Sequence, residues 1–453
     1  MRMTMKQFAL LFLSIVLLSG VGDLRAESGP GRLLGRTHNS GFPEGHDTYN
    51  AMGAASDGCI YYVLSSESID VGARMFAFDP RNSSIRCVGD LTAACGEKDL
   101  KAIPQGKSHV NFVESQGKLF FATHVGVYSI VDGMETMGIP PSGYRPYPGG
   151  HLLSYDLRSG QFEDLVKVPD QEGVLTMSMD VVHGRIFGLT WPSGLFFRYD
   201  VQSHDLKNFG PSCALGEKGK GADYRTVCRS ICVDPATGRA WFSTSEGRIY
   251  GYSPAADSIN PVEGEDLRKD YFGIYDPTSP GHMGYNWRQT AWHSGQKKVY
   301  GVHGNSGYLF RFDPDATTIE VLDRLTSLPS QRSGMFDQFS YGYLGFGMGP
   351  DGRTLHYLTG APIYVNGRRL AGKASTAMGE AKGLEDLHLI TYDVRKEAYN
   401  DRGAIFYENG DRPLYVNSLA VGKDGSVYFL ARIKENGRTR CDLVEVKKQW
   451  KLR

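Results

Sequence analysis

The sequence predicts an all-β fold, a seven-bladed β-propeller whose ring is closed by strands from both ends of the chain. A turn ending in glycine and followed by an apolar strand recurs seven times, and a later strand of recurring pattern follows each one. The composition, with 56 glycines and 11% aromatic residues, suits many short strands joined by tight turns. Repeats of roughly 40–60 residues with several strands each are typical of propeller blades.

The N-terminus precedes this fold. Met1–Lys6 is basic, Phe8–Val21 is a continuous apolar run, and the small residue Ala26 comes before a polar sequence. This layout predicts a secretory signal peptide over residues 1–26 and an exported protein, secreted or periplasmic. The alternative is a single N-terminal anchor helix, although the apolar run is short for a membrane span. Residues 27–453 then form one propeller domain.

The blades follow one another along the chain. Their turn-plus-strand units begin at Ser56, Ser115, Val182, Ala236, Ser294, Pro350 and Lys423, and their third strands end in segments beginning at Met75, Leu152, Leu195, Ile249, Leu309, Leu389 and Leu443. The last blade lacks an outer strand after Leu443. We expect Arg32–Arg36 to supply it, which would join the two ends of the chain and protect the open edge.

Charge and cysteine usage exclude some classes of function. The formal net charge is +0, which argues against a nucleic-acid-binding surface, and no later apolar segment is long enough to cross a membrane. Seven cysteines in an exported chain permit disulfides, and Cys87 and Cys95 are close enough in sequence to staple a loop. Cys228 and Cys232 share one strand face and are expected to be buried apolar residues.

Long insertions gather on one face of the predicted ring. The turns between first and second strands are tight in every blade, so the insertions fall on the opposite face. They are Val125–Gly150, Pro211–Asp223, Glu263–Met283, Thr326–Phe339 and Gly360–Leu387. Loops that a rigid scaffold does not need for closure usually build a binding site.

Equivalent positions of the blades meet near the channel on that face. His109 lies near the start of an innermost strand, and His124 ends the second strand of the same blade. The counterparts of His109 are Asn50, Thr176 or Met177, Arg229, Arg288, Leu344 and Asn417. The counterparts of His124 are Ser65, Trp191, Ser245, His303, Gly360 and Arg432. Tyr224, Tyr285, Tyr343 and Tyr415 lie beside the innermost-strand positions.

Basic side chains from separate blades, with few acidic residues in the same register, favour an anionic ligand. Polar residues line many propeller channels without doing chemistry, so the cluster is more informative than its members. His151 follows two glycines at a strand start, and the alternative to a binding role there is a residue that caps the loop. The sequence contains no G-x-S-x-G, P-loop or H-E-x-x-H motif, and no carboxylate pair falls in the inner register.

Histidine, arginine and tyrosine suit elimination next to a uronic acid. Positive groups neutralise the sugar carboxylate so that the proton beside it can leave. A histidine of near-neutral pKa removes that proton, and a tyrosine or second histidine protonates the leaving oxygen. Arginine binds a carboxylate in bidentate fashion.

Lys107–Asp156 carries a more specific likeness. KSHVNFVESQGKLFFATHVGVYSIVDG, followed by YPGGHLLSYDL, resembles the propeller-type polysaccharide lyases, most of all the secreted ulvan lyases. The resemblance implies endolytic β-elimination at a uronate of a sulfated algal polysaccharide, with His109 and His124 as base and carboxylate neutraliser. It further implies a structural metal ion, zinc or calcium, in some members. We assign no ligands to it here, and the chemistry itself requires no cofactor.

We therefore expect a monomeric, secreted polysaccharide lyase whose partner is an anionic polysaccharide substrate. The predicted catalytic residues are His109, His124, Tyr224, Tyr285 and Arg229. The predicted substrate-binding residues are Arg288, His303, Asn50, Asn417, Trp191 and His151. The alternatives are a non-catalytic propeller that binds glycans or scaffolds an assembly, and a propeller hydrolase or lactonase.

Overall fold

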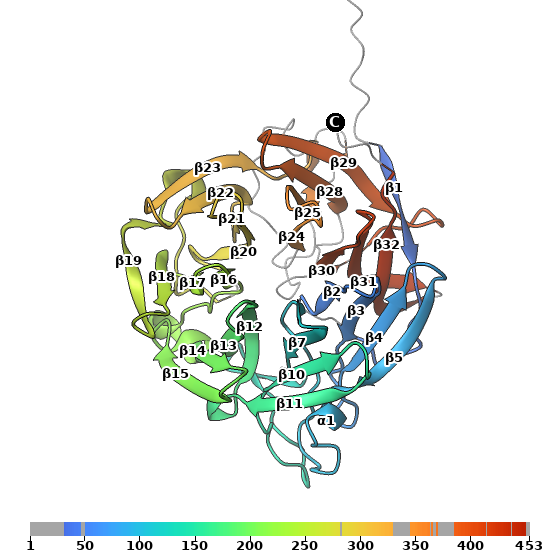
Figure 1. Ribbon diagram of the computed structural model, residues 1–453. Coiled ribbons are helices and arrows are strands. Elements are labelled where there is room, and N and C mark those ends of the chain that lie inside the picture. The colour runs from blue at the N-terminus through green and yellow to red at the C-terminus, as the bar shows by residue number, and fades with distance from the viewer. Residues whose placement is uncertain are drawn as a thin grey trace, which may run out of the picture.

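The repeats of the sequence form antiparallel sheets that stand around a central axis (Figure 1). The computed structural model describes residues 31–449 apart from 47–49, 281–282, 329–344, 363, 366–367, 370–384, 414 and 436. The predicted signal peptide, Leu344 and Tyr343 lie outside the described residues. Among these residues the helical segments are short: α1 (Leu91–Ala94) and four 3-10 turns, η1 (Pro169–Gln171), η2 (Gly216–Lys218), η3 (Gly221–Asp223) and η4 (Asp270–Phe272). The prediction of an all-β propeller is confirmed.

Five of the sheets have four strands each, numbered from the channel outward. The first contains β2 (Met52–Ala54), β3 (Ile60–Leu64), β4 (Arg74–Asp79) and β5 (Ser84–Asp90). The second contains β6 (Val113–Ser115), β7 (Lys118–Ala122), β10 (His151–Asp156) and β11 (Phe162–Lys167). The third contains β12 (Gly173–Asp180), β13 (Arg185–Trp191), β14 (Leu195–Asp200) and β15 (Asp205–Pro211). The fourth contains β16 (Cys232–Asp234), β17 (Arg239–Ser243), β18 (Arg248–Ser253) and β19 (Ser258–Asp266). The fifth contains β20 (Trp287–His293), β21 (Lys298–His303), β22 (Tyr308–Asp313) and β23 (Thr318–Arg324).

The remaining blade strands join into one eight-stranded sheet with two four-stranded halves. One half contains β24 (Phe346–Met348), β25 (Thr354–Pro362), β28 (Glu385–Asp393) and β29 (Ala398–Phe406). The other contains β30 (Val416–Val421), β31 (Val427–Glu435), β32 (Arg438–Val446) and β1 (Arg32–Thr37). Two further hairpins, β8 (Tyr128–Val131) with β9 (Met134–Met137) and β26 (Tyr364–Val365) with β27 (Arg368–Arg369), lie in the insertions.

Strand β1 closes the ring as the sequence predicts. Its second half pairs antiparallel with β32, with Gly35 opposite Val446. Its first half pairs parallel with β29 of the neighbouring blade, with Leu33 opposite Ile405. The N-terminal strand therefore completes the last blade and also ties it to the blade before it, which explains why two blades share one sheet.

Aromatic contacts between neighbouring sheets hold the ring together. Tyr61 and Tyr155, from the first and second blades, have ring centroids 5.8 Å apart. Trp241 and Trp292, from the fourth and fifth, stack at 5.6 Å. Buried aromatic side chains carry a large apolar area, so this packing supplies much of the driving force for closure.

Two glycines of second strands explain how the aromatic residues of third strands fit. Gly188 lies opposite Phe197, and Gly301 lies opposite Phe310. A Cβ at Gly188 would come within 2.3 Å of the Phe197 ring, and a Cβ at Gly301 within 2.4 Å of the Phe310 ring. Each ring therefore lies directly over the backbone of the adjacent strand.

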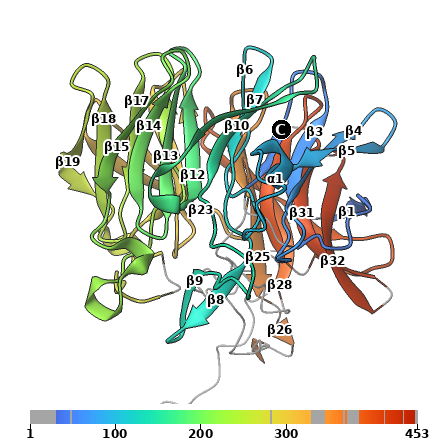
Figure 2. The same ribbon diagram turned by 90° about the horizontal axis from the view of Figure 1, so that it is seen from below.

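The described insertions project from one face of the ring. Figure 2 shows the β8–β9 hairpin and β26 extending from the edge opposite the β6–β7 turn. In the described part of the chain we find no helix of the length and apolarity needed to cross a membrane. All seven cysteines are free thiols, so the Cys87–Cys95 bond that their spacing permits is not formed: Cys87 is exposed on β5, whereas Cys95 is buried after α1. Cys228 and Cys232 are buried, as predicted.

Candidate functional site

His109 and His124 come together because two backbone segments of the second blade pair. Lys107 and His124 exchange backbone hydrogen bonds, with N···O distances of 3.0 and 2.7 Å. This bridge extends the sheet beyond β6 and β7, and it places the two imidazole rings with centroids 5.6 Å apart. The predicted convergence of these two histidines is therefore present.

Backbone carbonyls fix the tautomer of both rings. Nδ1 of His109 lies 2.7 Å from the Leu175 carbonyl oxygen, and Nδ1 of His124 lies 3.0 Å from that of Val125. A carbonyl only accepts, so Nδ1 carries the proton in each ring and the lone pair is on Nε2. Nε2 of His124 has no hydrogen-bond partner among the described residues. The Val125 carbonyl therefore leaves the Nε2 lone pair of His124 available to accept a proton.

Both rings are buried and uncharged near neutral pH, so neither has the near-neutral pKa that the sequence argument expects of a histidine base. His109 is only 5% exposed, and His124 is only 2% exposed. Burial, followed by the charge of Lys107, lowers the pKa of His124 to about 3. Burial also lowers the pKa of His109 well below its usual value, and His124, Arg229, Lys107 and Arg288 add to that effect.

Three cations surround the histidine pair. Lys107 is buried, and its Nζ donates to the Tyr128 hydroxyl at 3.2 Å while lying 4.6 Å from the centroid of that ring. Arg229 and Arg288 are buried as well, and both lie close enough to His109 to act on its pKa. Cationic side chains from separate blades thus lie around the pair.

Carboxylates modify the prediction of uncompensated positive charge. Burial raises the pKa of Glu135 on β9, and Lys107 and Arg229 lie close enough to oppose that effect. Glu217, in the insertion after β15, lies 2.7 Å from Nη1 of Arg229, and it also accepts from the Trp191 indole at 2.8 Å. The expectation of uncompensated positive charge is therefore wrong for Arg229. Glu217 escaped prediction because it lies in a loop, where no strand register brings it into line with the inner positions.

Aromatic rings form one wall of the pair. The Trp191 ring lies 5.6 Å from the His124 ring, and Tyr128 packs edge-on against Trp191 at the same distance. Tyr128, at the start of β8, donates to the Val125 carbonyl at 2.9 Å. Trp191 is among the site residues predicted from the sequence. Lys107 and Tyr128 are not, although Lys107 lies two residues before His109 and Tyr128 lies four residues after His124.

His303 and Tyr285 belong to a second cluster. His303 stacks on Phe272 at 4.2 Å, and Tyr275 contacts both His303 and Tyr285 at 5.5 and 5.6 Å. The Ser306 backbone N–H donates to Nδ1 of His303 at 3.3 Å, so the imidazole proton is on Nε2. Burial lowers the pKa of His303 to about 3. This tautomer is the opposite of that in His124.

Other predicted site residues have separate surroundings. Asn50 accepts a hydrogen bond from Gln289 on β20 at 3.1 Å, which links the first and fifth blades at the channel. Tyr224 is buried after η3. Asn417 is on the inner strand β30, opposite Leu430.

His151 does not join the channel. Its Nδ1 lies 2.9 Å from Asp164, and its Nε2 lies 3.0 Å from the buried Glu97. Hydrogen bonds to these carboxylates raise its pKa against the opposing effect of burial. Carboxylates near α1 and on β11 therefore hold both ring nitrogens, and the assignment of His151 to substrate binding stays a prediction.

The structural metal ion that the resemblance implies in some members stays a prediction. Among the described residues, no group of three or more histidine, cysteine, aspartate or glutamate side chains is arranged to hold one.

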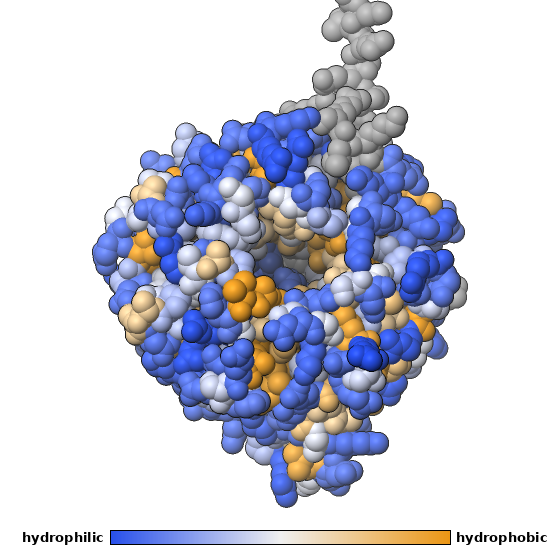
Figure 3. Space-filling view, in the orientation of Figure 1, coloured by the Kyte–Doolittle hydropathy of each residue, from blue (hydrophilic) through white to orange (hydrophobic). Residues whose placement is uncertain are grey.

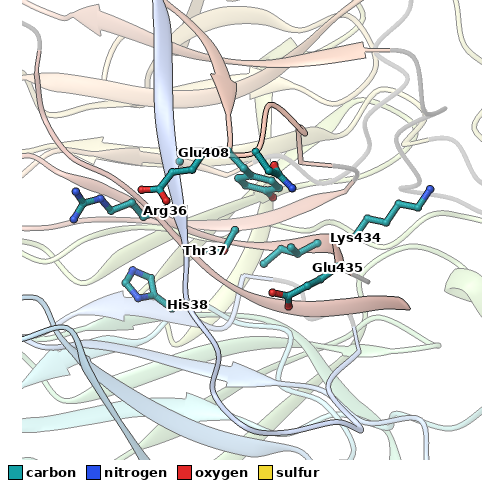
Figure 4. A pocket seen from close by; sticks show the side chains of 10 residues that line it. Arg36, Thr37, His38, Glu408, Lys434 and Glu435 are labelled. Carbon is teal, nitrogen blue, oxygen red and sulfur yellow. The ribbon is translucent and has the colours of Figure 1, made fainter. Parts of the chain in front are cut away.

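The surface is hollowed at the centre of the ring (Figure 3). A separate cleft of about 360 Å³ lies at the ring closure. It is lined by side chains of both charges, among them Arg36, His38, Glu408, Lys434 and Glu435 (Figure 4). Its residues come from β1, β31 and the end of β29. The cleft therefore lies where β1 stops pairing with β29 and begins to pair with β32.

No family model matches the chain, and no curated protein matches it. Among solved structures, a chain of the mitotic checkpoint complex superposes with a TM-score of 0.50 at 10% identity, over 99% of both chains. The β-propeller domain of Myceliophteria thermophila Cps50 (Swd1) gives a TM-score of 0.48 at 10% identity, over 90% of this chain and 98% of that one. Identity this low bears on fold alone.

Proposed function

We propose that the protein is a secreted polysaccharide lyase that cleaves a uronate-containing, sulfated polysaccharide of the ulvan type by β-elimination. The observation that carries the proposal is the state of His124. Its tautomer is fixed by a carbonyl, and its Nε2 has no hydrogen-bond partner among the described residues. A base needs this arrangement to accept a proton.

The cations supply the second requirement. The proton at C5 of a uronate is weakly acidic, and its removal places negative charge on the adjacent carboxylate. Lys107 and Arg288, buried beside the pair, would stabilise that charge where water cannot screen it. Arg229 would contribute less, because Glu217 already neutralises part of its charge.

Elimination then proceeds in one sequence of bond changes. Nε2 of His124 takes the C5 proton, the electron pair forms a double bond between C4 and C5, and the bond from C4 to the glycosidic oxygen breaks. The leaving oxygen takes a proton from an acid. Tyr128 suits this role better than Tyr224 or Tyr285, because its hydroxyl lies 3.4 Å from the His124 ring and accepts from the Lys107 ammonium. A neighbouring cation makes a phenol more acidic.

A non-catalytic glycan-binding propeller is the second candidate, and one observation favours it. Both histidine rings are almost wholly buried, whereas a base must touch the carbon-bound proton of its substrate. If the pair serves only to shape a cationic surface, polymer binds and no bond breaks.

Replacement of His124 by Ala tests the proposal. We expect elimination, followed by the ultraviolet absorbance of the new double bond, to fall at least a thousandfold, while binding of ulvan and the fold are kept. His204→Asn is the matched control, because His204 is an exposed histidine in the β14–β15 turn with φ of 57°, which asparagine tolerates. Equal activity in His124→Ala and wild type would refute the role of His124. Binding without any absorbance change in the wild type would establish the glycan-binding propeller instead.

A further inference from the structure

A second cleft lies on the outer side of the fifth blade, next to the His303 cluster. It has a volume of about 570 Å³, and Lys269, Tyr271, Tyr308, Asp323 and Arg324 are among the residues that line it. Lys269 and Tyr271 come from the insertion around η4, whereas the other three come from β22 and β23. The insertion and the end of the blade therefore build the cleft together.

Its lining combines aromatic and aliphatic side chains with charged edges, the aliphatic ones being Ile319, Val321 and Leu322. Tyr271 is 69% exposed, which is unusual for a large aromatic side chain, and it meets the Tyr308 ring edge-on at 6.3 Å. The Arg324 guanidinium lies 5.4 Å from the centroid of the Tyr308 ring. Lys269 pairs with Glu265, and Asp323 adds a carboxyl group whose pKa burial raises.

Residues that line or adjoin the cleft also contact the His303 cluster. Phe272 stacks on His303 at 4.2 Å and also contacts Tyr308 at 6.3 Å. Arg324 donates to the Ser306 carbonyl at 3.2 Å, and the Ser306 hydroxyl lies 2.9 Å from Nδ1 of His303. One layer of side chains thus separates the cleft from His303.

We propose that this cleft is an outer subsite that holds one glycosyl unit of a polysaccharide chain, remote from the histidine pair. A sugar ring presents C–H groups on one face and hydroxyl, carboxylate or sulfate groups at its edge. The C–H face of the sugar would pack on the Tyr271 ring. Its polar edge groups would meet Lys269, Asp323 and Arg324, which offer hydrogen-bond donors and acceptors. The inference rests on the proposed function for the identity of the polymer but does not require cleavage.

The test is binding of ulvan by the intact protein in the His124→Ala background, measured as retardation in gels that contain the polymer. Tyr271→Ala should weaken binding about tenfold, which is ~1.4 kcal/mol. Tyr271→Phe should bind as before, since it keeps the ring. Val182→Ala is the control, because Val182 is 66% exposed in the β12–β13 turn, on the opposite face.

Chain length gives the second arm of the test. An unsaturated disaccharide from ulvan is too short to reach both sites, so its binding, measured by calorimetry, should be the same in Tyr271→Ala and its parent. Equal retardation of Tyr271→Ala and its parent by the polymer would overturn the subsite. So would an equal loss of disaccharide and polymer binding, because Tyr271 would then belong to a single site. A protein that binds in this Tyr271-dependent way but never cleaves would refute the lyase proposal and leave the subsite standing.

Discussion

The buried, neutral state of His124 makes the stability of the protein sensitive to acid. In the unfolded chain a histidine titrates near 6.5, whereas burial lowers the pKa of His124 in the folded protein to about 3. Between these values the unfolded chain binds a proton that the folded protein does not, so stability falls as the pH falls below about 6.5. The slope is about 1.4 kcal/mol per pH unit, and a drop to about pH 5 therefore costs about 2 kcal/mol for this residue.

His124→Gln removes this titration and isolates its contribution. We expect the free energy of unfolding of wild type to fall more steeply with acid than that of the variant, by about 2 kcal/mol between about pH 7 and pH 5. Denaturant unfolding at several pH values measures the difference, with His204→Asn as control. Parallel pH profiles for wild type and His124→Gln would show that His124 is charged or solvated in the folded protein. The buried, neutral state of the His124 ring would then be refuted.

Three further predictions follow from other parts of the ring. Gly188→Ala should destabilise the protein by about 1–3 kcal/mol in thermal or denaturant unfolding, because the added Cβ meets the Phe197 ring; an unchanged midpoint would contradict this packing. Glu97→Gln should lower the free energy of unfolding by about 1–3 kcal/mol below about pH 6.5, because Glu97 helps raise the pKa of His151. This loss of stability should shrink as the pH rises through the pKa of His151. A loss that does not change with pH would contradict the pairing of Glu97 with His151. Removal of residues 31–37 should expose the edges of β29 and β32 and cause aggregation in light scattering, whereas a soluble, folded product would show that β1 is dispensable.

Much of this architecture was predictable from local pattern. Strands repeat with a period of two and turns require glycine, so the repeats and the closing strand could be placed from the sequence alone. The same register placed His109 and His124 together, because both lie at fixed distances from one glycine turn. These are consequences of backbone geometry, which the pattern of residues reports directly.

Residues outside that register were not predictable in the same way. Glu217 reaches Arg229 from an insertion whose path no periodicity fixes. His151 begins a third strand, and which side of the sheet its ring faces depends on Glu97, in a linker of the neighbouring blade. Tyr285 packs with Tyr275 because of the conformation of the insertion around η4. In each case a long-range contact, rather than local pattern, determines the outcome.

The most direct test of the central claim is the ultraviolet absorbance of the purified wild-type protein mixed with ulvan, with other uronate polymers run in parallel. Elimination leaves a conjugated double bond at the new non-reducing end, and hydrolysis does not. The account predicts a steady rise in absorbance with ulvan. A flat trace with every polymer, in samples where binding is detected, would contradict it and establish a propeller that binds glycans without cleaving them.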